Sequence, residues 1–451
     1  MIETEGRRAI VLGYGRSGRA ATSYLKRHGA SVLVVDRADT PELRSAMERD
    51  GVSGWLGPKP PPALDDADFL VVSPGVAWDS PLVEAARERG IDVTSEIDLF
   101  FDLCPCRIVG ITGTNGKTTT TALTAEVLRS GGLGVVRGGN IGEPVLDRLE
   151  QLRPDQWVVL ELSSFQLESI RHPRLRIGAV LNVTPDHLDR HKTMERYREI
   201  KARAVLFMEP EDHALLNFDD PACAAMAKQT RGTVLPFAIE SKIDGGIQVR
   251  DGSICCAREG KLQTVLPVSE VPLPGAHNLS NVMAAVGAGL AAGVPAEQIA
   301  EAVRNFKAVE HRLELIDSFN GVRWYNDSKA TNPDSTYKAL EAFSEPIVLI
   351  AGGRNKGIDL GPLASRIARR VAGLVTIGET GEELARLVRA EGMDQVERAA
   401  DLRGAVQRAA SMAKSGSVVL LSPAFTSFDM FSDYEDRGRQ FKATVLEELD
   451  R

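Results

Sequence analysis

Short apolar runs alternate with longer stretches of helical pattern along almost the whole chain. Such alternation is typical of α/β proteins whose sheets are largely parallel. The alternation begins anew near Arg107 and again after Phe306, so we expect three domains, spanning residues 1–97, 98–308 and 309–451. The expected strands are Ala9–Gly13, Ser31–Asp36 and Phe69–Gly75 in the first domain, Arg107–Ile111 and Trp157–Glu161 in the second, and Val322–Asn326, Ile347–Ala351, Leu374–Gly378 and Ser417–Leu421 in the third.

The composition narrows the class of protein. Of the 451 residues, 43% are hydrophobic and 26% are charged, which suits a soluble protein with several buried cores. The net charge of −8 argues against nucleic acid as the main partner, because there is no basic excess to neutralise a phosphate backbone. Five cysteines without C-x-x-C spacing indicate reduced thiols. Neither a signal peptide nor a run of about 18 apolar residues is evident, so we expect a cytoplasmic protein without a membrane span.

The most informative segment is the loop G-I-T-G-T-N-G-K-T-T-T-T at residues 110–121, which lies between a strand and a helical run predicted over Thr119–Arg129. Backbone N–H groups of such a loop, together with the positive end of the helix, favour a polyphosphate. In this role Lys117 would reach the terminal phosphates and the Thr118 hydroxyl would bind Mg2+. The loop is a shortened form of G-x-x-x-x-G-K-[ST], since Ile111 stands where that pattern has its first glycine. The alternative is a structural turn with a surface lysine.

A second glycine-rich turn, Gly13–Gly18, matches G-x-G-x-x-G between a strand and a helix, and Asp36 ends the following strand. Glycines let the backbone approach a pyrophosphate, and an acid at this place can accept hydrogen bonds from a ribose. The pattern predicts a nucleotide-like ligand. NAD and a ligand-free structural turn are the alternatives.

Acids and histidines suggest a metal next to the first loop. Glu161 ends an apolar strand, where P-loop proteins hold Mg2+ beside the phosphates; otherwise it is a surface acid. The segment Asn182–His191 is dense in Asp and His, as in zinc or manganese phosphoesterases, but its D-H-x-D-x-H spacing matches no familiar zinc pattern. We therefore expect His187 to lie beside Mg2+ or substrate, and His191 to be a surface or capping residue.

Other polar segments say less when taken alone. Lys201, in a helical run, is by default a solvated charge. Asn278 precedes an alanine-rich helix and either contacts a base or caps the helix. His311-Arg312 and Asn326–Thr331 place charges where ligands gather in open α/β sheets, and Arg312 is suited to a phosphate.

Together these segments resemble the Mur ligases of peptidoglycan precursor synthesis, and the resemblance covers essentially the whole chain. The shared motifs are G-T-N-G-K-T, E-L-S-S-F-Q-L, N-V-T-P-D-H-L-D-R-H, H-N-x-x-N, H-R and N-D-S-K-A-T-N. The segment at residues 421–438, L-S-P-A-F-T-S-F-D-M-F-S-D-Y-E-D-R-G, is the most specific to the glutamate-adding branch. The resemblance implies a Rossmann-like N-terminal domain for a UDP sugar and a central P-loop ATPase-type parallel sheet. It also implies a Rossmann-like C-terminal domain that closes over ATP and binds D-glutamate.

The implied activity is ATP-dependent addition of D-glutamate to UDP-N-acetylmuramoyl-L-alanine through an acyl phosphate, giving ADP and phosphate. The implied ATP contacts are Gly113, Thr114, Asn115, Gly116, Lys117, Thr118, Thr119, Asn278, Arg312, Asp327 and Lys329. The implied contacts to the UDP substrate are Ser17, Asp36, Arg37, Gly75, Asn140, Ser163, Gln166 and His187. Those to D-glutamate are Thr331, Lys356, Ser427, Phe428 and Tyr434, the last standing where the family commonly has phenylalanine.

The resemblance also implies a metal site with a modified lysine. Mg2+ would be held by Thr118, Glu161, His187 and Lys201, and the spacing Y-R-x-x-K marks Lys201 as the carbamylated lysine of the family. Carbamylation turns a cation into an anionic oxygen ligand, and this interpretation replaces the solvated helix charge. Lys117, His187 and Lys201 are the implied catalytic residues.

Three alternatives to this function share some of its features. A sister ligase or a folylpolyglutamate synthetase would use the same chemistry with another acceptor, and the segment Ser427–Tyr434 speaks against both. An NAD-dependent oxidoreductase would rest on Gly13–Gly18. A non-catalytic NTP-dependent interaction module would show no phosphate release stimulated by substrate. We expect a monomer whose partners are small molecules, without nucleic acid.

Overall fold

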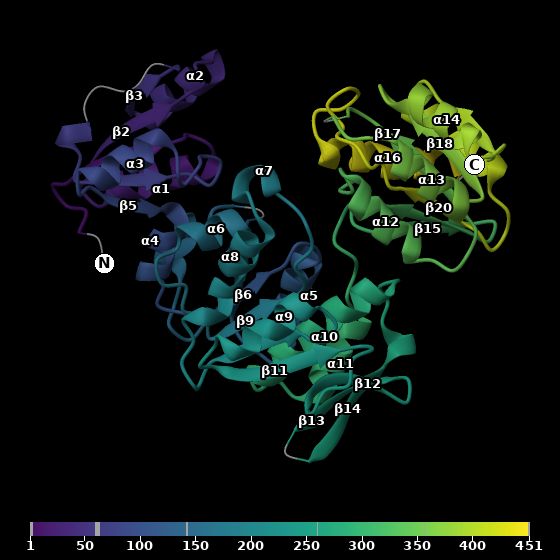
Figure 1. Ribbon diagram of the computed structural model, residues 1–451, viewed down its shortest axis with the longest axis horizontal. Helices are drawn as coiled ribbons and strands as arrows, with labels where there is room; N and C mark the ends of the chain where they lie inside the picture. Colours follow the sequence, from purple (N-terminus) through teal and green to yellow (C-terminus); the bar gives the residue numbers. More distant parts are fainter. Residues whose placement is uncertain (1–2, 59–63, 141–142, 259, 356, 450–451) are drawn as a thin grey trace. The chain divides into compact units, whose positions relative to one another are not determined.

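The computed structural model describes residues 3–58, 64–140, 143–258, 260–355 and 357–449. The chain divides into two compact units, one made of Met1–Val268 and Ser280–Val303, the other of Ser269–Leu279 and Arg304–Arg451. Two sheets lie in the first unit and one in the second (Figure 1). The predicted α/β class with three domains is confirmed. The boundaries at residues 97 and 308 stay predictions.

The N-terminal sheet is entirely parallel, with strand order β3-β2-β1-β4-β5. Its elements are β1 (Arg8–Leu12), α1 (Arg16–Arg27), β2 (Ser31–Asp36), α2 (Pro41–Asp50), β3 (Ser53–Leu56), η1 (Leu64–Asp66), β4 (Phe69–Val72), α3 (Pro81–Glu88) and β5 (Asp92–Ser95), followed by α4 (Glu96–Leu103). The order reverses between β1 and β4. At such a switch point the loops that follow the two strands diverge and leave a crevice for a ligand.

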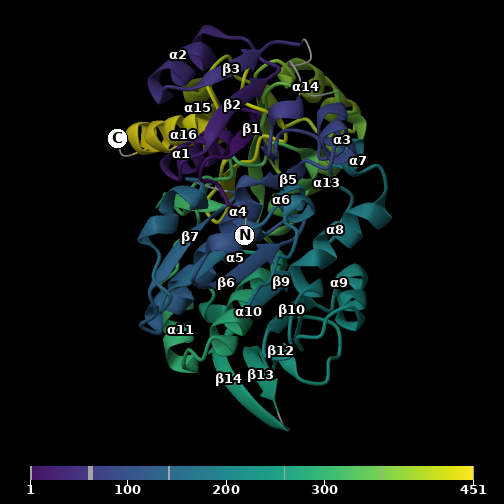
Figure 2. The same cartoon turned by 90° about the vertical axis from the view of Figure 1, so that its left-hand side faces the viewer.

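The middle sheet has nine strands in the order β14-β13-β12-β11-β10-β9-β6-β8-β7. It is parallel from β7 to β12, and β12, β13 and β14 pair antiparallel. The β13–β14 hairpin extends from one end of this sheet, as Figure 2 shows. The elements are β6 (Arg107–Thr112), α5 (Lys117–Ser130), β7 (Val135–Gly139), η2 (Val145–Gln151), β8 (Trp157–Glu161), α6 (Ser164–Ser169), β9 (Ile177–Val180), α7 (Leu188–His191), α8 (Met194–Leu206), β10 (His213–Asn217), α9 (Pro221–Ala225), η3 (Met226–Lys228), β11 (Thr233–Ala238), β12 (Gly246–Arg250), β13 (Ser253–Arg258), β14 (Lys261–Pro267), η4 (Val268–Glu270), α10 (Ala276–Ala291) and α11 (Ala296–Arg304).

The C-terminal sheet has six strands in the order β15-β16-β20-β17-β18-β19, parallel except for β15. The elements are β15 (Glu314–Phe319), β16 (Val322–Asn326), α12 (Pro333–Glu341), β17 (Ile347–Gly352), α13 (Gly361–Arg370), β18 (Gly373–Ile377), α14 (Gly381–Ala390), β19 (Val396–Arg398), α15 (Leu402–Met412), β20 (Val418–Leu421) and α16 (Tyr434–Leu449). Alternate residues of β17 serve two cores: Ile347 and Leu349 pack with α12, α13 and α14, whereas Val348 and Ile350 pack with α15 and α16.

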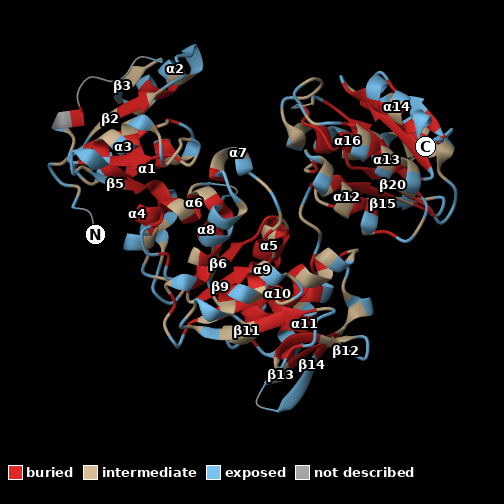
Figure 3. Cartoon of the chain, viewed as in Figure 1, coloured by how far each residue is buried: buried red, intermediate tan, exposed pale blue. Residues whose placement is uncertain are grey.

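The interior strands of all three sheets are largely buried, as Figure 3 shows. This explains why they stand out in the sequence as continuous apolar runs, since parallel strands are covered on both faces. Within the described part of the chain, no helix combines the length and apolar character needed to cross a membrane.

Candidate active site

The glycine-bearing loop at residues 113–116 connects β6 to α5. Strand β6 lies between β8 and β9, so the loop emerges from an interior strand of the middle sheet. Gly116 has a φ of 85°, and a Cβ on it would lie 2.1 Å from Asn281 Oδ1, so only glycine fits there. Helix α5 begins directly after it, at Lys117, two residues before the predicted Thr119. The Lys117 Nζ donates to Gly113 O at 3.0 Å and to Thr114 O at 2.8 Å, which places the ammonium group on the loop itself.

The segment after β9 braces this loop. Asn182 Oδ1 accepts a hydrogen bond from Asn115 N at 2.8 Å, and Asn182 Nδ2 donates to Asn115 O at 3.1 Å. Thr114 Oγ1 lies 3.1 Å from Thr184 O and also accepts from Thr184 N at 3.0 Å. The motif N-V-T therefore fixes the loop in one conformation. No role was predicted for Asn182, although its place just after the interior strand β9 was a usable signal.

Glu161 ends β8 next to the loop and is only 2% exposed. Its Oε1 accepts a hydrogen bond from Asn140 Nδ2 at 3.1 Å. Its Oε2 has no hydrogen-bond partner among the described residues. A buried carboxylate oxygen without a partner is costly, and a cation would satisfy it. The surface-acid alternative is wrong for Glu161, and this oxygen fits a metal ligand beside the loop.

Lys201, on α8, lies beneath the same loop. It is 1% exposed, and its Nζ donates to Gly113 O at 2.9 Å and lies 3.4 Å from Thr112 Oγ1. The ring of Tyr197 lies below the ammonium group, with its centroid 4.7 Å from Nζ. Burial lowers the pKa of Lys201 well below that of a free lysine, and the nearby Lys117 adds to the effect. The interpretation of Lys201 as a solvated helix charge is wrong.

His187 lies at the surface near this cluster. It adopts a left-handed conformation with φ of 53°, and its side chain is about half exposed. Its ring centroid is 5.0 Å from that of Phe165, and its Nε2 is 3.5 Å from Asp186 Oδ2. The imidazole ring of His187 is therefore accessible to solvent and to a ligand.

His191 is buried, so its predicted place as a surface or capping residue is wrong. It is 4% exposed, and its Nε2 lies 2.9 Å from Ser164 Oγ. The ring is stacked between those of Phe165 and Tyr197, at centroid distances of 5.3 Å and 5.4 Å. Burial, together with neighbouring cations that include His187, Arg190 and Lys201, lowers the pKa of His191 to about 4.

This low pKa makes stability depend on pH. As pH falls through about 6.5, the unfolded chain binds a proton on His191 and the folded chain does not, so the folded state loses stability down to the folded pKa of about 4. We expect His191→Gln, which keeps a hydrogen-bonding group near Ser164, to reduce the loss between pH 7 and pH 5 by on the order of 1–2 kcal/mol. Urea denaturation at the two pH values measures it. His172→Gln, at an exposed position, is the matched control, and equal losses in wild type and His191→Gln would contradict the prediction.

A cavity of about 540 Å³ lies at the switch point of the N-terminal sheet. It is lined by the turns after β1, β2 and β4 and by residues that follow β7. Six of the eight residues predicted to bind the UDP substrate line it: Ser17, Asp36, Arg37, Gly75, Asn140 and Gln166. The other two do not: His187 is described above, and Ser163 caps α6 in a reciprocal pair with Gln166. The structure therefore brings most of this predicted set together.

The glycines of the N-terminal turn shape this cavity. A Cβ on Gly18 would lie 1.9 Å from Gly13 O, so α1 can pack against the turn only without a side chain there. Asp36 holds the turn, since its Oδ2 accepts from Tyr14 N at 2.8 Å and its Oδ1 accepts from Ala38 N at 2.9 Å. Asp36 thus accepts two backbone hydrogen bonds and also lines the cavity.

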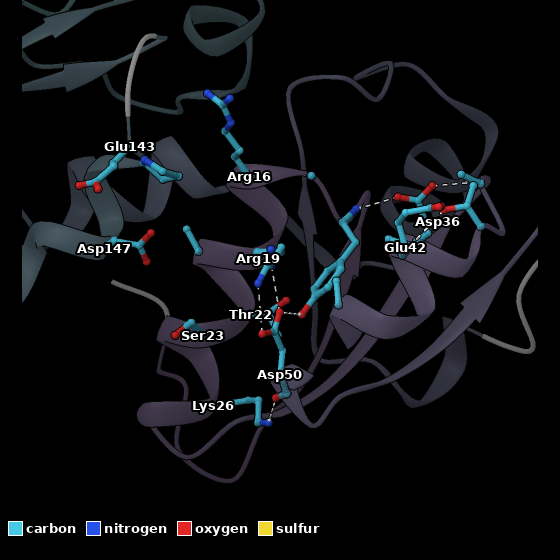
Figure 4. Close-up of a pocket in the computed structure, with 18 of the residues that line it drawn as sticks. Arg16, Arg19, Thr22, Ser23, Lys26, Asp36, Glu42, Asp50, Glu143 and Asp147 are labelled. Carbon is cyan, nitrogen blue, oxygen red and sulfur yellow. Dashed lines mark hydrogen bonds and ion pairs between the residues drawn. The ribbon is translucent and has the colours of Figure 1, made fainter. Parts of the chain in front are cut away.

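Figure 4 shows a second cavity, of about 1150 Å³. Its lining shares Tyr14, Arg16 and Asp36 with the lining of the first cavity. In it, Arg19 Nε donates to Asp50 Oδ2 at 2.9 Å, and Tyr14 Oη donates to the same oxygen at 2.8 Å. Side chains of both charges line this cavity, so its charge favours no particular class of ligand. This cavity was not predicted.

In the second unit, the predicted ATP contacts lie on two neighbouring loops. Arg312 lies between His311 and Leu313, which have φ of 66° and 41°. Leu313 N donates to Asp327 Oδ1 at 3.2 Å, and Ser422 Oγ donates to Asp327 Oδ2 at 2.8 Å. Burial raises the pKa of Asp327 to about 7. These bonds bring the Arg312 and Asp327 loops together, and Arg312 Nε is buried without a partner among the described residues.

The remaining predicted ATP contacts belong to the same unit. Asn278 is buried, and its Nδ2 donates to Pro274 O at 2.7 Å, so it holds the start of α10. Lys329 Nζ lies 5.8 Å from the ring centroid of Tyr434, a residue predicted to contact D-glutamate. The structure thus joins parts of the two predicted sets.

The predicted D-glutamate residues are placed as follows. Thr331 N donates to Lys329 O at 2.9 Å, which keeps Thr331 next to the proposed ATP contacts. Ser427 is 2% exposed, and its carbonyl accepts from two later backbone N–H groups, which makes a turn. Phe428 is 59% exposed, and Tyr434 Oη donates to Glu435 Oε1 at 3.0 Å. Lys356 lies outside the described residues.

Comparison with known proteins gives consistent results over the whole chain. Residues 7–95 match the Mur ligase MurD-like N-terminal domain, residues 111–289 the Mur ligase middle domain, and residues 311–425 the Mur ligase glutamate ligase domain. The chain is 43% identical over 444 residues to the UDP-N-acetylmuramoylalanine–D-glutamate ligase of Pelotomaculum thermopropionicum, covering 98% of this chain and 97% of the relative. It is 42% identical over 447 residues to the ligase of the same name from Koribacter versatilis, covering 98% of each.

Solved structures share the fold. The MurF ligase of Thermotoga maritima in complex with ADP matches with a TM-score of 0.62 at 18% identity, over 99% of this chain and 95% of that one. The UDP-N-acetylmuramate–alanine ligase MurC of Thermotoga maritima matches with a TM-score of 0.58 at 18% identity, over 98% of this chain and 99% of that one. At these identities the likeness concerns the fold alone.

Proposed function

The chain belongs to the Mur ligase family, and from this premise we propose that it joins D-glutamate to UDP-N-acetylmuramoyl-L-alanine, with ATP converted to ADP and phosphate, in peptidoglycan precursor synthesis. The observation that carries the proposal is the full-length similarity to ligases named for this reaction. The ready-made phosphate loop with its buried acid and lysine supports it. We also propose that the enzyme works in the cytoplasm, where ATP is present, as a monomer.

ATP is held first by the loop that precedes α5. The N-terminus of α5 is proposed to face the phosphates, whereas the backbone N–H groups of Thr114 and Asn115 are taken up by Asn182. The residues assigned to the phosphates are Gly113, Thr114, Asn115, Gly116, Lys117, Thr118 and Thr119. Lys117 Nζ donates to the carbonyl oxygens of Gly113 and Thr114. When ATP binds, it would donate to the terminal phosphate oxygens instead. Its charge stabilises the negative charge that moves with the transferred phosphoryl group.

The residues around the loop fit Mg2+. Thr118, Glu161, His187 and Lys201 are the proposed ligands, and the unpartnered Oε2 of Glu161 is the feature of the structure that supports this. Bound there, Mg2+ would neutralise phosphate charge during transfer. Asn140 lines the UDP cavity and also donates to Glu161, so it links the substrate cavity to the proposed metal site.

Lys201 is proposed to be carbamylated. Burial depresses the pKa of its amine, which increases the fraction of neutral, nucleophilic amine that attack on CO2 requires. The product carries a negative charge in place of a positive one, which removes the repulsion with Lys117 and offers oxygen ligands under the loop. Gly113 O, which accepts from the unmodified amine, would be released.

The chemistry proceeds in two steps. The carboxylate of the L-alanine moiety attacks the γ-phosphorus, ADP leaves, and an acyl phosphate forms. The neutral amine of D-glutamate then attacks the acyl carbon, the tetrahedral intermediate expels phosphate, and the amine loses a proton to give the amide. The C-terminal unit supplies Asn278, Arg312, Asp327 and Lys329 for ATP, and Thr331, Lys356, Ser427, Phe428 and Tyr434 for D-glutamate, all as proposals. Exclusion of water protects the acyl phosphate from hydrolysis.

A panel of amino acids tests the acceptor. With UDP-N-acetylmuramoyl-L-alanine and ATP, we expect D-glutamate to stimulate phosphate release. We expect L-glutamate, L-alanine, L-lysine and diaminopimelate to give roughly 10²-fold less release or none. A site that binds both carboxylates of the D enantiomer leaves buried polar groups unpaired when another amino acid binds. Mass spectrometry of the product identifies the new amide. Preference for another amino acid would assign the chain to a sister ligase. Absence of phosphate release stimulated by substrate would assign it to the non-catalytic NTP-dependent class.

A further inference from the structure

One buried arginine joins the two loops that carry the proposed ATP and D-glutamate contacts. Arg437, on α16, is 1% exposed. Its Nε donates to Ser328 Oγ at 2.9 Å, and its Nη2 donates to Ser328 O at 2.7 Å. Its Nη1 donates to Phe425 O at 3.1 Å. All three nitrogen atoms of the guanidinium group are therefore used, and they reach two segments almost a hundred residues apart in the sequence.

Both segments lie in the proposed site. Ser328 is the residue between Asp327 and Lys329, the two ATP contacts proposed on that loop. Phe425 stands two residues before Ser427, at the start of the proposed D-glutamate segment. The segments Asp327–Lys329 and Phe425–Ser427 are thus held by the same side chain.

A second link closes the arrangement at the start of α16. Ser328 Oγ, which accepts from Arg437, donates its own proton to Tyr434 O at 2.8 Å. Ser328 is fully buried, so water does not compete for these bonds. The loop at Ser328 is fixed to both ends of the proposed D-glutamate segment: to Phe425 through Arg437, and to Tyr434 directly.

Stability alone does not explain a cation at this place. The hydrogen-bond acceptors of Arg437 are a hydroxyl and two carbonyl oxygens, and no carboxylate hydrogen-bonds to it among the described residues. Asp429 and Asp327 act on it only at longer range, and burial lowers its pKa to about 10, which still leaves it charged at neutral pH. Burying a charge against neutral oxygens costs free energy that well-packed apolar groups would not. A geometric role accounts for its presence.

We propose that Arg437 is a positioning residue for the ligation reaction, which fixes the D-glutamate segment 425–434 against the ATP-contact segment 327–329. This inference rests on the proposed function. The planar fork of arginine reaches three oxygens on two segments at once, whereas the single ammonium group of lysine keeps the charge and loses the fork. A lysine variant therefore separates geometry from charge.

Steady-state kinetics of Arg437→Lys tests the proposal. We expect KM for D-glutamate to rise roughly 10-fold or more, with a smaller rise in KM for ATP, because small misplacements of a binding segment have large kinetic effects. KM for UDP-N-acetylmuramoyl-L-alanine should stay within about twofold, because all residues that line its proposed cavity belong to the first unit and Arg437 belongs to the second. A purely structural role would instead lower the active fraction and leave all three KM values unchanged.

Matched variants decide between the outcomes. Arg439→Lys, two residues along the same helix and exposed, should behave as wild type. Ser328→Ala removes one hydrogen-bond acceptor of Arg437 and the hydrogen bond to Tyr434 O, so it should also raise KM for D-glutamate. Combining it with Arg437→Lys should raise this KM no further. Ser328→Ala alone tests the proposal if Arg437→Lys fails to fold. Wild-type KM values in both Arg437→Lys and Ser328→Ala would overturn the inference. Failure of the wild type itself to ligate D-glutamate would overturn the proposed function instead.

Discussion

Lys117→Ala should reduce ADP release by roughly 10²–10³-fold or more, the loss measured when a group that stabilises transition-state charge is removed. Lys117 is the first residue of α5, and its Nζ already lies on the loop, against Gly113 O and Thr114 O. Removing it takes away a positive charge where the γ-phosphoryl group is proposed to move. A coupled assay of ADP, with both other substrates saturating, measures the loss.

The control for this variant is Lys242→Ala, which removes an exposed lysine of the same unit and should leave turnover unchanged. Binding of UDP-N-acetylmuramoyl-L-alanine should also be retained by Lys117→Ala, because Lys117 does not line the N-terminal cavity. Calorimetric titration tests this point. Near-normal ADP release by Lys117→Ala would remove Lys117 from the proposed mechanism.

Local patterns predicted the elements that hold the site. Short runs rich in β-branched and aromatic residues are typical of strands, which is why β2 and β16 were predicted with the bounds that the structure has, Ser31–Asp36 and Val322–Asn326. The glycine-bearing turns were recognised because each needs a conformation or a close approach that only glycine allows, as Gly116 and Gly18 show.

The antiparallel strands β12 to β14 were not predicted. Four residues at the start of β14 are exposed, so its sequence lacks the apolar run of a central strand. A usable signal was present, since Asp251-Gly252 lies between β12 and β13 with φ of 47° and 72° at the two residues. An Asp-Gly pair between two strands of this kind is a strong indicator of a hairpin.

Burial of individual polar residues could not be read from the sequence. Lys201 and His191 lie in polar runs that suggest exposure to solvent, yet both side chains are buried. Segments from elsewhere in the chain cover them: Gly113 of the phosphate loop covers Lys201, and Phe165 of α6 covers His191. Arg437 lies in a recognised motif, but no role was predicted for it. Its partners Ser328 and Phe425 are distant in the sequence and contact it only in the folded chain. Such contacts depend on tertiary packing, which periodicity does not encode.

Lys201→Ala should lower turnover by roughly 10²-fold or more, as expected for loss of a group that supports a metal ligand set and a phosphate loop. The side chain is 1% exposed beneath Gly113, so the variant leaves a small space under the loop. Short carboxylates such as acetate or formate should enter this space and restore part of the activity, because they supply the anionic oxygens that a carbamate would provide. Activity is measured against carboxylate concentration at constant ionic strength.

Two controls separate rescue by a carboxylate from a general salt effect. Lys117→Ala should show no rescue, since its lost group is a cation, and chloride at equal concentration should not restore Lys201→Ala. In the wild type, removal of bicarbonate and CO2 should slow turnover, and ¹³C-bicarbonate should give a carbamate signal by NMR, because the depressed pKa of Lys201 keeps a neutral amine available. Full activity of Lys201→Ala without carboxylate, or a wild type that is indifferent to CO2 and shows no carbamate signal, would contradict the modification.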